Sequence, residues 1–107
     1  MTTVRELFEK MPEHFKKDAA KGMNAVYQFD ITGEGGGKWY AKISNGELNV
    51  IEGEYSEPDL TVTMNAKDYI DMAEGKLNGM AAFTMGKLKI KGDMLLAMKM
   101  ATIFSLT

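Results

Sequence analysis

The decisive stretch of this sequence is Gly75–Thr107, GKLNGMAAFTMGKLKIKGDMLLAMKMATIFSLT. Between positions 94 and 106 its only polar residues are Lys99, Thr102 and Ser105, which recur every third position and form one narrow stripe on a helix. The rest of that helix is apolar, which is typical of a buried helix. It is too short for a membrane span, which needs about 20 predominantly apolar residues. We therefore expect this helix to be covered by the rest of the protein, or to cover part of it.

Upstream of that helix, the same stretch predicts a short helix and a strand. Asn78 can cap a helix over Gly79–Met85, because its side-chain oxygen can accept hydrogen bonds from the first free N–H groups. Leu88 and Ile90 then alternate with lysines, as the inward residues of a half-buried strand do. Asp93 is placed to cap the final helix.

The residues before this stretch predict a helix, four strands and a further helix. Apolar residues with helical spacing begin at Val4. Pro12 is expected to end that helix near Met11 and to leave a looser helical turn as far as Ala20. Alternating apolar residues predict strands over 25–32, 38–43, 47–52 and 60–64, and helical spacing returns over 66–74.

This order of elements predicts an α+β fold with one mostly antiparallel sheet of five strands. The pair Asn45-Gly46 is the strongest short-range hairpin signal, so the first three strands should form a meander. Helices are expected on one face of the sheet only, because the outward residues of the strands are polar. These residues are Lys38, Lys42, Thr61, Thr63, Lys87, Lys89 and Lys91.

Composition narrows the class of protein. The chain has 107 residues, of which 45% are hydrophobic, and a formal net charge of −2, so we expect one globular domain and no nucleic-acid partner. The absence of cysteine excludes disulfides, thiolate metal sites and cysteine nucleophiles. The first residues, MTTVRELFEK, do not have the pattern of a signal peptide, and we expect a cytoplasmic protein.

No catalytic constellation is visible in the sequence. His14 is the only histidine, and no nucleophile or carboxylate pattern accompanies it. Asp68 and Asp71 lie three apart on a predicted helix, where they serve the helix dipole and solubility. The lysines around the last strand protect a sheet edge from wrong pairing, with attraction to anionic lipid headgroups as a lesser alternative. We therefore expect no enzyme, no metal and no cofactor.

The ten methionines leave two interpretations of the apolar residues open. Methionine is flexible and polarisable, so it fills gaps in a core and also lines surfaces of variable shape. Met80, Met85, Met94, Met98 and Met100 all lie in the C-terminal stretch. From the residues alone, a packed core and an apolar cavity are equally good interpretations.

Motifs along the whole chain resemble the sterol carrier protein 2 domain. They are Tyr27-Gln28-Phe29-Asp30-Ile31, Gly36-Gly37-Lys38-Trp39, Asn45-Gly46, Pro58-Asp59-Leu60-Thr61-Val62-Thr63-Met64, Gly75-Lys76-Leu77, Ala82-Phe83, Gly86-Lys87-Leu88-Lys89-Ile90-Lys91-Gly92 and Leu96-Ala97-Met98-Lys99. They occur in the family's order, and residues 75–99 are the most specific part.

The resemblance implies a five-stranded mixed sheet with helices on one face, enclosing an apolar tunnel for a sterol, fatty acid, acyl-CoA or phospholipid tail. It also implies a set of ligand-binding residues: Trp39, Met80, Phe83, Thr84, Met94, Met98, Ala101 and Ile103. Relatives carry glutamines where this chain has Met80, Met98 and Ala101, which implies a less polar cavity here.

The function implied by the resemblance is that of a non-enzymatic, intracellular lipid carrier. Residues 1–107 would form a single stand-alone domain, and the C-terminal helix would close its tunnel. A hydrophobic small molecule is then the expected partner, with transient membrane contact and a homodimer as further possibilities. The alternative is a protein-interaction or homodimerisation module that uses the apolar C-terminal helix as its interface.

Overall fold

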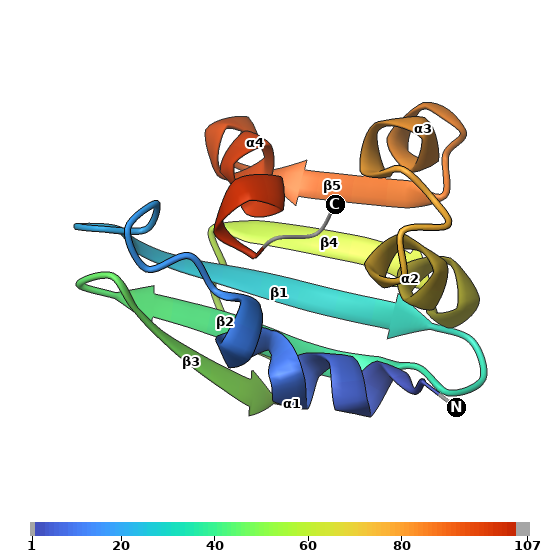
Figure 1. Ribbon diagram of the computed structural model, residues 1–107, viewed down its shortest axis with the longest axis horizontal. Coiled ribbons are helices and arrows are strands. Elements are labelled where there is room, and N and C mark those ends of the chain that lie inside the picture. The colour runs from blue at the N-terminus through green and yellow to red at the C-terminus, as the bar shows by residue number, and fades with distance from the viewer. Residues whose placement is uncertain (1, 105–107) are drawn as a thin grey trace.

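The computed structural model describes residues 2–104, without the side chain of Ala101, and has principal extents of 33 × 25 × 25 Å. Figure 1 shows how its helices and strands are arranged. In chain order they are α1 (Val4–His14), β1 (Asn24–Thr32), β2 (Gly37–Ser44), β3 (Glu47–Glu52), β4 (Leu60–Asn65), α2 (Ala66–Ala73), α3 (Gly79–Thr84), β5 (Leu88–Gly92) and α4 (Met94–Ile103).

The five strands form one mixed sheet in the order β3-β2-β1-β4-β5. β1 and β4 run parallel, with Tyr27 opposite Leu60, and the other neighbouring pairs are antiparallel. The turn between β2 and β3 is the predicted hairpin, since Asn45 and Gly46 have φ angles of 53° and 77°, the positive values that a type I′ turn requires. The predicted α+β class and mostly antiparallel five-stranded sheet are confirmed.

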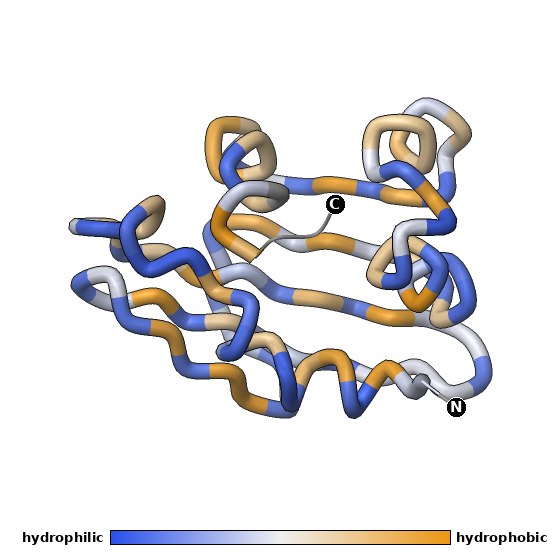
Figure 2. Tube along the Cα trace, viewed as in Figure 1, coloured by the Kyte–Doolittle hydropathy of each residue, from blue (hydrophilic) through white to orange (hydrophobic). Residues whose placement is uncertain are grey.

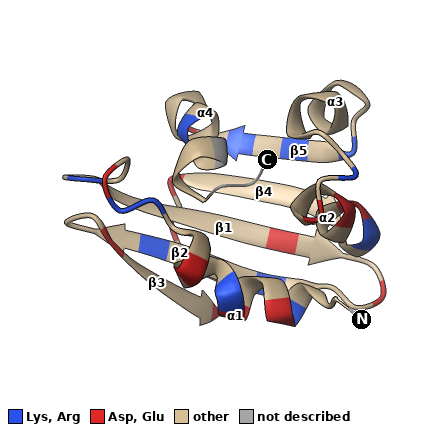
Figure 3. Ribbon diagram, viewed as in Figure 1, with Lys and Arg blue, Asp and Glu red and all other residues tan. Residues whose placement is uncertain are grey.

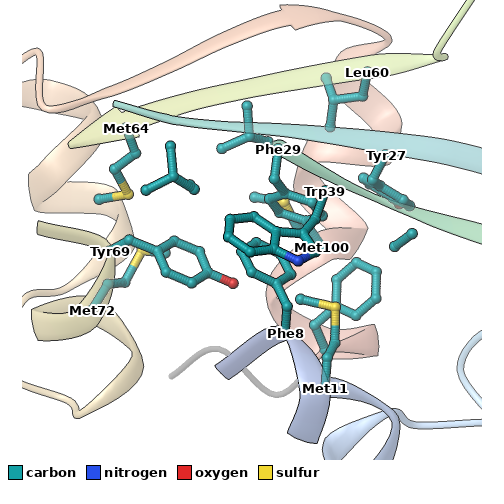
Figure 4. Close-up of a cluster of buried hydrophobic side chains, with 14 of the residues drawn as sticks. Phe8, Met11, Tyr27, Phe29, Trp39, Leu60, Met64, Tyr69, Met72 and Met100 are labelled. Atoms are coloured by element: carbon teal, nitrogen blue, oxygen red, sulfur yellow. The ribbon is translucent and has the colours of Figure 1, made fainter. Parts of the chain in front are cut away.

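The helices pack on one face of this sheet (Figure 1), where they share a single hydrophobic core with the inward residues of the strands. Phe8 of α1 lies at its centre. Its ring stacks on Trp39 and Tyr69, with centroids 4.6 and 5.2 Å away, and meets Phe29 edge-on at 5.2 Å (Figure 4). Such aromatic pairs add to the free energy of burial, so the space beneath α1 and α2 is a filled core.

The opposite face of the sheet is less polar than predicted. β2 and β1 separate β3 from β4, so the connection over residues 53–59 has to cross the sheet, and its hydrogen bonds to Gln28 place it on this face. It buries Gln28, whose side chain accepts a hydrogen bond from the N–H of Tyr55 (2.8 Å) and donates to the carbonyls of Trp39 and Gly53 (both 3.2 Å). β1 is therefore buried on both faces, although its alternating sequence is typical of a half-buried strand, because this crossing covers the second face.

The buried amide of Gln28 leads to a stability prediction. In Gln28→Leu, the Tyr55 N–H and the two carbonyls lose their partner, and a buried unsatisfied group costs about 1–3 kcal/mol. We expect the free energy of unfolding, measured by urea denaturation, to fall by about 2–3 kcal/mol. Asn49→Leu, at an exposed position of β3, should change it by no more than about 0.5 kcal/mol. Equal losses in the two variants would contradict this role of Gln28.

The first helix begins as predicted and ends later than predicted. The Oγ1 atom of Thr3 accepts a hydrogen bond from the N–H of Glu6 at 3.1 Å, which caps α1. The expected end near residue 11 is wrong, because α1 includes Pro12 and continues to His14. Pro12 lies in the last turn, where the missing N–H and the proline ring disturb only the end of the helix.

The final helix is less buried than its sequence predicts. Met100, Ile103 and Phe104 are buried in the core, whereas Leu95 and Met98 expose 69% and 74% of their surface. α4 packs on β4 and β5 at the edge of the sheet, so hydrophobic residues of its first turns project beyond the sheet (Figures 1 and 2). Within residues 2–104, no helix is long and apolar enough to cross a membrane.

Candidate functional site

An apolar groove of about 480 Å³ lies between α3 and α4, over the edge strand β5. In Figure 1 the two helices stand near opposite ends of β5. The lining residues come from α2, α3, β5, α4 and the cap of α3: Met72, Asn78, Gly79, Met80, Phe83, Leu88, Ile90, Met94, Ala97, Met98 and Met100.

Asn78 positions α3, which forms one wall of the groove. Its Oδ1 atom accepts hydrogen bonds from the N–H groups of Met80 and of the next residue, at 2.8 and 3.2 Å, so the helix begins directly after it. Met80 and Phe83 are three residues apart and therefore lie on the same side of the helix. Gly79 also lines the groove, and a Cβ atom at this position would lie 3.7 Å from the Met72 sulfur, an ordinary van der Waals contact.

The edge strand β5 forms the floor. Leu88 and Ile90 face the helices, and the lysines that alternate with them face the other side, so hydropathy alternates along the strand in Figure 2. The strand ends at Gly92, which has a φ of 121°. A Cβ atom there would overlap with the carbonyl oxygen of Asp59, so glycine is needed for the chain to turn from the floor into α4.

Two side chains position α4, the second wall. Asp93 accepts a hydrogen bond from the N–H of Leu95 at 2.9 Å, and the hydroxyl of Tyr27 on β1 donates to the carbonyl of Leu96 at 3.0 Å. Burial raises the pKa of Tyr27, with smaller effects from the carboxylates of Asp93 and Asp59, so its hydroxyl stays protonated and donates. This bond ties α4 to the centre of the sheet.

Exposure increases steadily from the floor of the groove to its mouth. Met72, Leu88 and Met100 are buried at the bottom. Met80 exposes 77% of its surface and Met98 74%, one on each wall. The groove is therefore closed below by the core and open to solvent between the two helices.

The chemistry available in the groove is that of an apolar surface. Asn78 provides the only polar side chain of the lining, which contains no ionisable group. Across residues 2–104, no cluster of three or more histidine, cysteine or acidic side chains could hold a metal ion. The arrangement can bury hydrocarbon, and the lining has no group that could act as a general acid, base or nucleophile.

Half of the predicted site residues border this groove. Met80 and Phe83 lie on the α3 wall, and Met94 and Met98 lie on the α4 wall. Thr84 is exposed outside the groove, where its hydroxyl donates to the carbonyl of Met80 at 3.0 Å.

The other predicted residues lie elsewhere. Ile103 is buried in the core, and the side chain of Ala101 lies outside the described part of the chain. Trp39 is buried against Phe8 and borders a separate depression of about 340 Å³ between α1 and β3. The guanidinium of Arg5 lies 5.8 Å from its ring centroid. Trp39 is thus part of the core beneath α1 and is not a wall of the groove.

Sequence reasoning did not assign seven of the lining residues to the site: Met72, Asn78, Gly79, Leu88, Ile90, Ala97 and Met100. A signal for some of them was present. Leu88 and Ile90 are the inward residues of a strand between the two walls, and Ala97 is one turn from Met94 on the same helix face. Met72 and Met100 could not be distinguished from ordinary core residues by pattern.

Comparison with known proteins identifies the family. Residues 4–105 match the model of the SCP-2 sterol transfer family. Over 103 residues the chain is 38% identical to hydroxysteroid dehydrogenase-like protein 2 of Bos taurus, covering 95% of this chain and 25% of that protein. The chain thus spans about a quarter of the length of the curated relatives it matches.

Solved structures share the fold. The crystal structure of sterol carrier protein 2 like 2 from Aedes aegypti matches with a TM-score of 0.76 at 25% identity, over 94% of each chain. The solution structure of palmitated SCP2L2 from the same organism matches with a TM-score of 0.77 at 24% identity, over 96% of this chain and 95% of that one. The chain belongs to the SCP-2 sterol transfer family, a family of lipid-binding domains, and the resemblance seen in its motifs is confirmed.

Proposed function

We propose that this chain is a non-enzymatic carrier, acting in the cytoplasm, that binds the hydrocarbon tail of a lipid in the groove between α3 and α4. The observation that supports this proposal is the composition of the groove. Ten of its eleven lining residues have no polar side chain, and the exception is Asn78. Its volume of about 480 Å³ lies in the range of small-molecule sites, roughly 300–1,000 Å³.

The affinity of such a site comes from removing methylene groups from water. Each buried CH₂ contributes about 0.8 kcal/mol. Five of the lining residues are methionines, whose flexible side chains adapt to a bent or disordered chain better than to a rigid ring system. We therefore propose a flexible acyl chain as the ligand, with its headgroup at the mouth near Asn78. An acyl chain is also the first ligand to test because a relative of the same fold is known in a palmitated form.

We propose that α4 closes the groove over a bound tail. Met94 and Met98 are exposed on the wall of the groove, so a movement of the first turns of α4 towards α3 would bring them over a bound tail. The buried end of the helix, with Ile103 in the core, would serve as the fixed point of this movement.

The length of the ligand tail provides the test. For a series of saturated fatty acids, we expect the dissociation constant to fall about fourfold with each added methylene until the groove is full, measured by displacement of a fluorescent fatty acid. Native mass spectrometry of the protein purified from its host should show a monomer with bound lipid. Affinity that does not change with tail length, together with a lipid-free protein, would contradict the proposal.

A second function is favoured by one observation, the exposure of Leu95 and Met98 on α4. Apolar surfaces of this kind mark protein interfaces as well as ligand sites. The alternative function is a homodimerisation or protein-interaction module. A lipid-free dimer in the native mass spectrum would favour it over the carrier.

A further inference from the structure

The methionines of this chain fall into two groups that differ in their exposure to solvent. Within residues 2–104, four of them expose more than half of their surface: Met80, Met85, Met94 and Met98. They lie on α3, directly after it, or on α4, and all except Met85 line the groove. The two methionines at the bottom of the groove are buried. The thioethers that a reagent in solution reaches first are therefore those at the mouth of the groove.

These thioethers are the oxidisable sulfur atoms of a chain that has no cysteine. Hydrogen peroxide converts a thioether to a sulfoxide. A sulfur lone pair attacks one peroxide oxygen, the S–O bond forms as the O–O bond breaks, and the other oxygen leaves as water with both protons. Sulfur loses two electrons and the peroxide gains them. Because the step needs no other group of the protein, exposure decides which methionine reacts.

A sulfoxide at the mouth opposes the binding of a hydrocarbon tail. Its oxygen accepts hydrogen bonds from water as long as the groove is open. The walls offer little in place of that water, since Asn78 at the start of α3 is the only polar side chain of the lining. Figure 3 shows no charged residue on α3, and α4 has only Lys99, which does not line the groove. Closing α4 over a tail therefore buries the oxygen without a partner, which is unfavourable.

We propose that Met80, Met94 and Met98 are sites of reversible oxidation, and that their sulfoxides release the lipid from the groove. This inference rests on the proposed function, because it names a modification that ends the binding proposed above. The effect is reciprocal, so a bound tail that covers the three sulfur atoms slows their oxidation. Reversal needs a methionine sulfoxide reductase, which takes two electrons from a dithiol and releases the oxygen as water. The exposure of the three side chains leaves them open to such an enzyme.

The first measurement follows oxidation residue by residue. The full chain is freed of lipid and treated with hydrogen peroxide, and its sulfoxides are located by peptide mass spectrometry. We expect the four exposed methionines to be oxidised well before Met72 and Met100, which are buried. Saturating palmitate should slow the oxidation of Met80, Met94 and Met98. It should leave the rate at Met85 unchanged, because that side chain is exposed outside the groove.

The second measurement is the dissociation constant for palmitate before and after oxidation, from displacement of a fluorescent fatty acid. In the wild type we expect it to rise roughly tenfold or more, the effect of one buried polar group that lacks a partner. Treatment with methionine sulfoxide reductases for both sulfoxide epimers should restore the original value. The fluorescence of Trp39, which is buried in the core, should stay native throughout and so distinguish this effect from unfolding.

Leucine variants identify the residues responsible, because leucine is apolar, has a similar volume and cannot form a sulfoxide. With Met80→Leu, Met94→Leu and Met98→Leu combined, the dissociation constant should be the same before and after peroxide, whatever its starting value. Met98→Leu alone should show a smaller rise than the wild type. Met85→Leu is the matched control, since it removes the exposed methionine outside the groove. It should lose affinity on oxidation as the wild type does.

Two results would overturn the oxidation proposal. One is equal affinity for palmitate in the reduced and the fully oxidised wild type. The other is a loss of affinity on oxidation that persists in the triple leucine variant. The proposed function fails separately, if the reduced wild type shows no dependence of affinity on tail length, and this series is measured before any peroxide is added.

Discussion

Replacing Ala97 with tryptophan is expected to abolish lipid binding and to leave the fold intact. Ala97 is half-buried on the α4 wall and lines the groove with Met94 and Met98. An indole at this position projects into the space that a hydrocarbon tail would fill. Because the groove is open at its mouth and is not a closed core, the larger side chain does not force packed elements apart.

The measurement for this variant is the amount of lipid that remains bound, by native mass spectrometry, together with displacement of a fluorescent fatty acid. Ala81→Trp is the matched control, since Ala81 is exposed on α3 and does not line the groove. It should bind lipid as the wild type does. If the Ala97 variant keeps its lipid, the ligand lies elsewhere, and the depression beside Trp39 between α1 and β3 is the next place to look.

Replacing Phe104 with alanine is expected to destabilise the protein more than Gln28→Leu does. Phe104 is buried directly after α4. Its ring meets Tyr27 nearly at right angles, with centroids 5.3 Å apart, and also contacts Phe29 and Phe15, both at 6.1 Å. Truncation of a buried phenylalanine costs about 3–5 kcal/mol, which is a large part of the roughly 5–15 kcal/mol that stabilises a domain.

Urea unfolding followed through Trp39, the only tryptophan, measures this loss. Trp39 is buried in the core, so its fluorescence reports on global unfolding. Leu95→Ala removes an apolar side chain from the exposed side of the same helix and should change the free energy of unfolding by about 0.5 kcal/mol or less. Similar losses in the two variants would show that the buried end of α4 does not anchor the helix.

The sheet and the starts of the helices could be predicted because local physical rules determine them. Alternation predicts which strand residues face the core, as for Leu88 and Ile90. Asn78 and Asp93 accept hydrogen bonds from the N–H groups of the helices they precede, as their positions indicate. Asn45-Gly46 forms the hairpin for the same reason, since both residues tolerate positive φ.

The residues of the site were harder to predict, because the sequence shows that a residue is apolar but does not show which apolar neighbour it meets. The resemblance implied Trp39 and Ile103 as ligand-binding residues, and the structure places both side chains in the core. Met72 and Met100 have the pattern of core residues, yet they also form the bottom of the groove. The hydrophobic effect is not directional. Only the packing of distant segments therefore decides whether an apolar residue lies in the core or lines the groove.

The C-terminal stretch, residues 75–107, shows what the sequence determines and what depends on the tertiary structure. Its sequence by itself determined a short capped helix, an edge strand and an apolar helix, and it carried the family motifs. Only the tertiary structure decided that α4 lies at the edge of the sheet, with Phe104 inside the core and Leu95 outside it. The physical reason is that the crossing 53–59 places β4 between β1 and β5, so the last helix meets the sheet at its margin and leaves a groove beside α3.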